Sequence, residues 1–301
     1  MKCLVTGGCG FIGGHMVDKL LELGHSVAVV DNFAAESDDF WKNSSESVVY
    51  YEDDICDVEK MSKIFEKEKF DWVFHMAAES RIQPALINPV KASHVNVTGT
   101  CILLNLSRDH KIKRFVYSST SACYGSKNKP PLREDMENDN LNPYAVTKLA
   151  AEDFCIMYWK TFETPTVALR YFNVYGDRMP SKGQYAPALA IFMKQKKEGM
   201  PLSVVGDGLQ TRDFIHVSDV VNANITVAES QKENVCGNAF NVGTGKNRTM
   251  LEIAEIISKN IIHIPARPGE SKDTLCDFSK IEKATGWQPK IDLREWLTKK
   301  G

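Results

Sequence analysis

The chain has 301 residues and a formal net charge of -2 at pH 7, from 37 basic and 39 acidic side chains. This balance gives no global attraction to nucleic acid or to an anionic membrane, and no apolar run approaches the roughly 18 residues that cross a bilayer. The apolar share of 43% is ordinary for a globular protein, and the length predicts one large or two modest domains.

The eight cysteines show no Cys-x-x-Cys spacing, which is typical of reduced and mostly buried thiols rather than of a disulfide framework. The N-terminus leads directly into a predicted strand, so we expect no signal peptide. The sequence therefore predicts a cytoplasmic protein that binds neither nucleic acid nor membranes.

In the first 172 residues, short apolar runs alternate with amphipathic helical patterns. This alternation is typical of an α/β fold, here a Rossmann-type doubly wound parallel sheet with helices on both faces. The predicted strands are Lys2–Val5, Ser26–Val30, Val48–Tyr51, Trp72–Met76, Arg114–Ser118 and Thr166–Tyr171. The predicted helices lie near Phe11–Leu23, Val58–Lys67, Val90–Ser107 and Pro143–Trp159.

From about residue 173, turn-rich segments with Pro and Gly separate shorter strands and helices. The clearest helices in this part are Ala186–Lys197 and Met250–Ser258. We predict a first domain over residues 1–172 and a smaller C-terminal α/β lobe over residues 173–301. No low-complexity linker separates them, so we expect the two to pack closely, with some C-terminal elements returning to the first domain.

A glycine-rich turn joins the first predicted strand to the first helix, with Gly7, Gly10 and Gly13 three residues apart. The first glycine permits a tight turn, the second lets the backbone approach a pyrophosphate, and the third lets helix pack on strand. Such a turn can need glycines for structural reasons alone. However, Asp31 ends the second predicted strand, where a carboxylate accepts a hydrogen bond from an adenosine ribose. That carboxylate repels a 2′-phosphate, and no arginine precedes Arg81, so the pattern favours NAD over NADP.

Tyr144 and Lys148 lie four residues apart in a predicted helix that starts at Pro143, so both side chains share one face. A lysine ammonium beside a phenol lowers the pKa of the phenol from about 10, and the tyrosine then acts as a base near neutrality. Such a pair also arises by accident on amphipathic helices. A Ser-Ser-Thr run ending at Thr120, at the end of the preceding strand, makes the signal specific. Strand ends line the ligand crevice, where the Thr120 hydroxyl would share a substrate oxygen with Tyr144.

Matching segments spread through nearly the whole chain and keep one order: Thr6–Gly13, Asp31-Asn32, His75–Ala78, Asn96–Thr100, Tyr144–Lys148, Arg170–Gly176, Gly206–Phe214, Asn241–Gly245 and Arg267–Glu270. With these segments the chain resembles an extended short-chain dehydrogenase/reductase of the nucleotide-sugar epimerase/dehydratase family. The resemblance implies that the first domain binds NAD and that the C-terminal lobe mainly binds a nucleotide sugar.

The resemblance also implies roles for particular residues. Asp54 and Ile55 would hold the adenine edge, unless Asp54 merely caps the next helix. The residues expected to contact NAD are Gly7, Gly10, Phe11, Ile12, Gly13, Asp31, Asn32, Asp54, Ile55, Met76, Ala77, Ala78, Ser80, Asn96, Ser118, Tyr144, Lys148 and Phe172.

On the substrate side, the resemblance implies that Asn173, Arg212 and Arg267 hold the diphosphate, with Glu270 near the ribose or base. Arginine suits this role because its fork donates two hydrogen bonds to phosphate oxygens. Surface ion pairs with Asp213 or Glu270 are the competing explanation of these arginines. The histidines show no metal-ligand spacing, so we expect no metal site.

The residue at position 122 distinguishes the reaction types of this family. Relatives that eliminate water or decarboxylate carry Glu at the position of Ala122, and one branch of dehydratases carries Asp at the position of Ser121. An alanine methyl neither delivers nor removes a proton, so hydride transfer at one carbon remains. We predict a 4-epimerase in which Tyr144, assisted by Thr120, takes the 4-hydroxyl proton while NAD accepts hydride from C4. The 4-keto sugar then turns, and hydride returns to the opposite face.

The sugar is predicted from one position. In similar epimerases, a residue after the second arginine motif walls the pocket beside the sugar C2, and counting from Gly269 to Asp277 places Thr274 there. A large aromatic would exclude an N-acetyl group, whereas threonine leaves room. We expect UDP-N-acetylglucosamine and UDP-N-acetylgalactosamine as substrates, with UDP-glucose and UDP-galactose also accepted. The alternative is that Thr274 only caps a turn.

Two other functions stay open. A reductase or other 4-keto-sugar-modifying enzyme of the same fold would consume reduced coenzyme stoichiometrically. A non-catalytic nucleotide-sugar-binding module would keep only the binding site, although the intact Thr120, Tyr144 and Lys148 argue against it. The family usually forms homodimers through two helices per subunit, here Val90–Ser107 and Pro143–Trp159. Apolar residues on these helices are equally consistent with core packing.

Overall fold

The computed structural model describes residues 1–34, 41–181, 187–265 and 272–300. Its centre is a seven-stranded sheet in which every pairing is parallel. The predicted doubly wound parallel sheet is confirmed. In order across the sheet, the strands are β10 (Ala239–Val242), β6 (Thr166–Tyr171), β5 (Arg114–Thr120), β4 (Trp72–His75), β1 (Lys2–Thr6), β2 (Ser26–Val30) and β3 (Val48–Tyr51).

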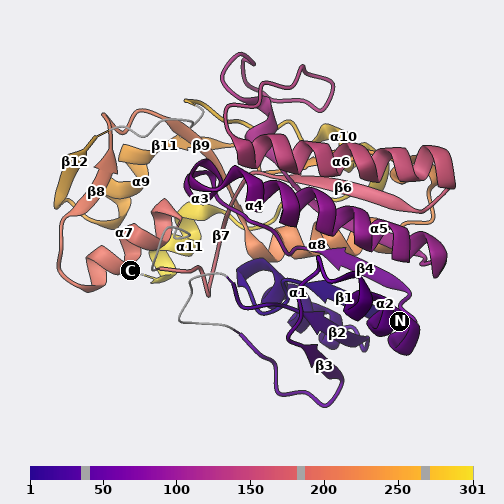
Figure 1. Ribbon diagram of the computed structural model, residues 1–301. Coiled ribbons are helices and arrows are strands. Elements are labelled where there is room, and N and C mark those ends of the chain that lie inside the picture. The colour runs from indigo at the N-terminus through magenta and orange to yellow at the C-terminus, as the bar shows by residue number, and fades with distance from the viewer. Residues whose placement is uncertain (35–40, 182–186, 266–271, 301) are drawn as a thin grey trace.

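Helices cover both faces of this sheet (Figure 1). Alternation along each strand divides the core between the faces, so that Val5 packs with one set of helices and Leu4 with the other. Because both faces are buried, the strands are near-continuous apolar runs, which is why the sequence predicts them well. One face carries α1 (Phe11–Glu22), α8 (Val217–Glu229) and α10 (Ser279–Thr285), and the other carries α2 (Val58–Glu68), α5 (Thr100–Asp109) and α6 (Pro143–Phe162).

The smaller lobe, at the left of Figure 1, has its own core around Phe192, Ile253 and Trp296. One small sheet has the order β11 (Asn247–Thr249), β9 (Thr211–His216) and β7 (Asn173–Tyr175), and a second pairs β12 (Ile261–Ile264) with β8 (Leu202–Val205). The helices of the lobe are α7 (Ala188–Lys197), α9 (Met250–Ile257) and α11 (Leu293–Lys300). The start predicted for α7, Ala186, lies outside the described residues.

The polypeptide crosses between the two parts more than once. After β7 and β9 in the lobe, α8 returns to cover the large sheet, and β10 becomes its edge strand beside β6. A short 3-10 turn, η3 (Glu233–Val235), connects these two elements. A single cut near residue 173 therefore does not separate the two packing units.

The segment predicted as one helix over Val90–Ser107 changes pitch twice. It comprises α4 (Pro89–Ser93), a π-helical stretch η1 (His94–Gly99) and α5. The Asn88 side chain caps α4 by accepting a hydrogen bond from the Lys91 amide at 2.9 Å. Single π-helical turns inside α-helices are frequent at functional sites, and η1 carries Asn96, which is described below. Two further short elements, α3 (Ile82–Ile87) and the 3-10 turn η2 (Ser121–Tyr124), follow β4 and β5.

Candidate active site

A cavity of about 600 Å³ opens at the carboxyl ends of β1, β4 and β5. Strand order reverses between β1 and β4, and ligands of open α/β sheets bind at such a switch point. The cavity continues to the smaller lobe, where Ser203, Gln210 and Arg212 line it. Both parts of the molecule therefore contribute to one site.

Most of the predicted site residues line this cavity. Asn96 does not, and Arg267 and Glu270 lie outside the described residues. Those that line it are Gly7, Gly10, Phe11, Ile12, Gly13, Asp31, Asn32, Asp54, Ile55, Met76, Ala77, Ala78, Ser80, Ser118, Thr120, Tyr144, Lys148, Phe172, Asn173, Arg212 and Thr274.

Close packing explains two of the three glycines in the first turn. Gly7 has φ +69, and a Cβ atom there would lie 2.8 Å from the amide nitrogen of Ala77. A Cβ on Gly13 would lie 2.0 Å from the carbonyl oxygen of Gly7. The glycine-rich turn after β1 and the first helical turn of α1 therefore pack closely against each other. The N-terminus of α1 faces the cavity. Backbone amides at such an end favour a phosphate group.

The Asp31 carboxylate helps to close this turn. Its oxygens accept hydrogen bonds from the amides of Cys9, at 3.0 Å, and Phe33, at 2.9 Å. Burial raises the pKa of Asp31, although these two amides and the charge of Lys42 oppose the shift. Each carboxylate oxygen has a further lone pair, so Asp31 retains the capacity to accept from a ribose hydroxyl.

Asp54 closes the neighbouring loop. It accepts hydrogen bonds from the Asn32 side chain at 2.9 Å and from the Cys56 amide at 2.8 Å. The alternative in which Asp54 caps the next helix is wrong, because Asp57 caps α2 through the Lys60 amide. Asp54 and Asn32 together form one wall of the cavity at the ends of β2 and β3.

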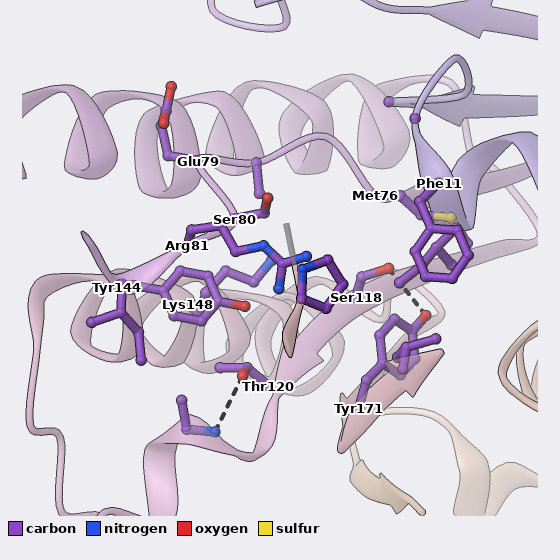
Figure 2. Close-up of a pocket in the computed structure, with 18 of the residues that line it drawn as sticks. Phe11, Met76, Glu79, Ser80, Arg81, Ser118, Thr120, Tyr144, Lys148 and Tyr171 are labelled. Atoms are coloured by element: carbon purple, nitrogen blue, oxygen red, sulfur yellow. Dashed lines mark hydrogen bonds between the residues drawn. The ribbon is translucent and has the colours of Figure 1, made fainter. Parts of the chain in front are cut away.

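Thr120, Tyr144 and Lys148 meet in the middle of the cavity (Figure 2). β5 runs two residues beyond its predicted end, so Thr120 is a strand residue and points to the same side as Ser118. The Asn142 side chain caps α6 by accepting from the Ala145 amide at 2.9 Å. Tyr144 therefore lies in the first turn of α6, and Lys148 follows one turn later on the same face.

The protonation of Tyr144 depends on more than Lys148. Burial raises the pKa of Tyr144, whereas the hydrogen bond with the Thr120 hydroxyl and the charge of Arg81 lower it. Burial also lowers the pKa of Lys148 to about 7, and its ammonium lies 4.3 Å from the centre of the Tyr117 ring. The expectation that Lys148 lowers the pKa of the Tyr144 phenol stays a prediction, because the lowering at Tyr144 comes here from Thr120 and Arg81.

Asn96 acts from behind the cavity wall. It is 1% exposed, and its side chain accepts from the Glu79 amide at 2.8 Å and donates to the Glu79 carbonyl at 3.1 Å. It also donates to the Thr147 hydroxyl at 2.9 Å. Asn96 thus ties the loop after β4 to α6. The family resemblance identifies Asn96 as a site residue but does not predict that it lies behind the cavity wall.

The end of the cavity at the smaller lobe is organised around a buried carboxylate. Asp213 is fully buried and accepts hydrogen bonds from the amides of Thr244, Gly245 and Cys276 at 2.9–3.0 Å. Arg212 faces the other way along β9 and donates to the carbonyls of Thr211 and Lys272. The competing explanation that Arg212 pairs with Asp213 is therefore wrong.

Thr274 lies on the cavity wall and is 8% exposed. Its hydroxyl accepts from the Asp213 amide at 3.2 Å, and its own amide donates to the Thr211 carbonyl at 3.2 Å. The side chain is therefore fixed in direction by β9. A larger side chain at this position would have to enter the cavity or displace the strand.

Five charged residues of the cavity, among them Asp53 and Lys91, were not predicted from the sequence. Glu79 and Arg81 follow β4, and Arg178 follows β7. Arg178 stacks on Trp41 at 4.4 Å and pairs with Asp18 at 2.8 Å. A usable signal existed for Arg81, because it follows a predicted buried strand within a few residues and the ends of parallel strands share one edge.

A Rossmann sheet with a glycine turn at β1 and with Thr, Tyr and Lys at the ends of β5 and the start of α6 defines an extended short-chain dehydrogenase/reductase. Within this class, the chain belongs to the GDP-mannose 4,6 dehydratase family, whose model matches residues 4–300.

Individual relatives extend this result over the full length. The chain is 35% identical over 301 residues to a putative UDP-glucose 4-epimerase of Methanocaldococcus jannaschii, with 98% of this chain and 95% of the relative covered. The structure of Thermotoga maritima UDP-glucose 4-epimerase with UDP-glucose is 33% identical, has a TM-score of 0.92 and covers 99% and 96% of the two chains. The Thermus thermophilus UDP-glucose 4-epimerase complex with NAD is 30% identical, with a TM-score of 0.89 and coverage of 99% and 96%.

No group of three or more His, Cys, Asp or Glu side chains in the described ranges is placed to hold a metal ion. In the same part of the chain, no helix is long and apolar enough to cross a membrane.

Proposed function

We propose that this protein is an NAD-dependent UDP-sugar 4-epimerase, which inverts C4 through a transient 4-keto sugar. The observation that carries the proposal is the meeting of Thr120, Tyr144 and Lys148 in a cavity that also contains a dinucleotide-type glycine turn. The relatives named as UDP-glucose 4-epimerases cover nearly the whole chain, and one of their structures contains NAD.

The residues present fit a dinucleotide. The turn at Gly7 and Gly13 has no space for Cβ atoms, and this brings backbone amides to the surface where a pyrophosphate would lie. The Asp31 carboxylate at the end of β2 suits a ribose with two free hydroxyls. When bound, NAD supplies the acceptor and donor of the hydride at the sugar C4. Ser118, Phe172 and Met76 would lie beside it.

In this proposal, Tyr144 moves the proton. Its phenolate takes the proton of the 4-hydroxyl as C4 is oxidised and returns it when C4 is reduced. The Thr120 hydroxyl orients that exchange, because it contacts the phenol of Tyr144. Lys148 follows Tyr144 by one turn of α6 and, with Tyr144 and Thr120, forms the group of side chains that would handle the proton.

The substrate would be anchored by its diphosphate rather than by its hexose. Arg212 and Asn173 line the far end of the cavity and offer donors for phosphate oxygens. A firmly held diphosphate and a loosely held hexose let the 4-keto sugar turn and present its other face. Thr274 is short, so we propose N-acetylated UDP-hexoses as substrates, together with UDP-glucose and UDP-galactose.

Ala122 argues against a dehydratase. It lies on the cavity wall two residues after Thr120, and its amide donates to the Thr120 hydroxyl at 3.1 Å. An acid at this position would be placed beside the sugar, but a methyl group has no proton to move. Elimination of water therefore has no catalyst at this place.

We also propose that two copies of the chain pair through the helices that follow β4 and begin at Pro143. Apolar side chains are exposed there, with Ile87 at 73%, Val90 at 78% and Val146 at 50%. A second copy would cover them. Light scattering should give a dimer mass, and Val90→Glu should lower it to that of a monomer.

All eight cysteines are unpaired, which supports our proposal that the protein works in the reducing cytosol.

The enzyme itself is tested without added coenzyme. The purified protein is incubated with UDP-N-acetylglucosamine, UDP-glucose or a 4-epimer, and the stereochemistry at C4 is followed by proton NMR. We expect interconversion of the 4-epimers without consumption of external coenzyme. Product formation only in the presence of stoichiometric reduced coenzyme would instead identify a reductase, and binding without any turnover would identify a binding module.

A further inference from the structure

Arg81 is a charged residue of the cavity that the proposed reaction does not yet use. It lies between the end of β4 and the start of α3, and it lines the same cavity as Thr120, Tyr144 and Lys148. Figure 2 shows its side chain extending from this loop toward the Tyr144 ring and the Lys148 chain. Arg81 is half-buried, and its guanidinium extends into the cavity on the side of Tyr144.

The loop that carries Arg81 is fixed to the catalytic helix. Asn96 holds both backbone groups of Glu79 and bonds to Thr147, whose hydroxyl donates to the Tyr144 carbonyl at 3.0 Å. A chain of hydrogen bonds thus joins the Arg81 loop to the first turn of α6. The distance between the guanidinium and the phenol is set by buried contacts rather than by a free loop.

Other charged and titratable groups also surround Tyr144. The Glu79 carboxylate, on the same loop, points away from the phenol in Figure 2 and pairs with Lys91 at 2.5 Å. Lys148 follows Tyr144 by one turn on α6, and burial lowers its pKa to about 7. The thiol of Cys123, from η2, raises the pKa of Tyr144, whereas Arg81 lowers it. The buried phenol of Tyr117 also lies within electrostatic range.

We propose that Arg81 is a positioning residue whose permanent positive charge stabilises the Tyr144 phenolate. A guanidinium stays protonated throughout the pH range in which enzymes work. The proposal rests on the proposed epimerase function, because it gives Arg81 a role in keeping Tyr144 ready to accept the sugar proton.

The test compares three variants of the full chain with the wild type. Arg81→Met removes the charge, Arg81→Lys keeps it, and Arg294→Met removes an equal charge from an exposed position on α11. The initial rate of C4 inversion is measured against pH at low and at saturating substrate. The phenolate is the active base, so loss of the cation should move the acid limb of the profile to higher pH.

We expect Arg81→Met to be about tenfold slower on the acid limb, to approach the wild type at high pH, and to leave KM nearly unchanged. Arg81→Lys should recover most of the rate, and Arg294→Met should follow the wild-type profile. An acid limb that does not move would overturn the proposal. A uniform loss at every pH with a raised KM would also overturn it, since Arg81 would then hold the substrate.

A second measurement does not need turnover. The ultraviolet difference spectrum of tyrosinate is titrated in the wild type and in Arg81→Met, each corrected by the matching Tyr144→Phe protein. Ionisation of Tyr144 at higher pH in Arg81→Met supports the proposal, and an unchanged titration contradicts it. If the titration shifts but no UDP-sugar is inverted, the epimerase function fails while the pairing of Arg81 with Tyr144 stands.

Discussion

The two ends of the cavity are assembled in different ways. At the nucleotide end, Gly7, Asp31 and Met76 each lie immediately after a strand of one parallel sheet, so the order of strands alone brings them together. At the substrate end, Arg212 and Thr274 come from segments far apart in the sequence, which meet only through small sheets and single backbone contacts. We infer that the nucleotide end tolerates little change without loss of the fold, whereas changes at the substrate end alter selectivity first.

The largest expected effect comes from the residue between the two ends. Tyr144→Phe should reduce C4 inversion on the order of 10³-fold, because it removes the proton acceptor, while both ends keep their ligands. Turnover and UDP-sugar affinity are measured together, the latter by calorimetry. Tyr158→Phe, on the same helix but outside the cavity, removes a hydroxyl bonded to Asn105 and should keep normal turnover. Normal turnover of Tyr144→Phe would contradict the catalytic assignment.

The rigidity of the nucleotide end is tested with Gly13→Ala. The new methyl group would lie 2.0 Å from the Gly7 carbonyl oxygen, so we expect a loss of about 3 kcal/mol or more in the free energy of unfolding. Gly10→Ala is the control, because its methyl group meets the same oxygen at 3.3 Å and should cost much less. Both values come from urea denaturation without ligands. Equal stability of the two variants would show that this turn yields easily.

The adaptability of the substrate end is tested with Thr274→Tyr. The ring would occupy cavity space, so activity on N-acetylated UDP-hexoses should fall at least about tenfold relative to activity on UDP-glucose. Thr274→Ser keeps the hydroxyl that accepts from the Asp213 amide and should leave the ratio as it is. The ratio of kcat/KM for the two substrates is the measurement. An unchanged ratio in Thr274→Tyr would remove Thr274 from the selectivity of the enzyme.

The smallest expected effect concerns His75, whose ring contacts Thr6 at the end of β1, next to the nucleotide end of the cavity. Its ring lies between the Thr6 hydroxyl at 2.7 Å and the Thr100 hydroxyl at 2.8 Å, and burial lowers its pKa from 6.5 to about 3. Between these two pH values the unfolded chain binds one more proton than the folded chain, so stability falls as the pH decreases. The slope from this residue is about 1.4 kcal/mol per pH unit.

Urea denaturation at a series of pH values below 6.5 measures this slope. His75→Gln should flatten it, whatever the variant costs in stability at neutral pH. His94→Gln changes an exposed histidine and should keep the wild-type slope. If His75→Gln and the wild type share one slope, the ring is accessible to protons in the folded state.

The contrast between the two ends of the cavity also explains which features could be predicted from the sequence. Most strands of the large sheet are buried on both faces, so continuous apolar runs reveal them, and the half-exposed edge strand β3 is still apolar enough to be predicted. The edge strand β10 was not predicted, because it lies in the turn-rich C-terminal part and joins β6 across a long separation. Asn96 was found by resemblance, but its place behind the wall depends on the π-helical pitch of η1, which no periodicity in the sequence indicates.

The amino-acid sequence by itself determined the parallel sheet, the glycine turn and the alignment of Tyr144 with Lys148, because each depends on spacing within one or two adjacent elements. Only the tertiary structure decided the surroundings of Tyr144. Burial lowers the pKa of Lys148, and a loop tied to α6 by Asn96 carries Arg81 into the same cavity. Charge and burial at one atom depend on every element packed around it, and that packing brings together residues that are distant along the chain.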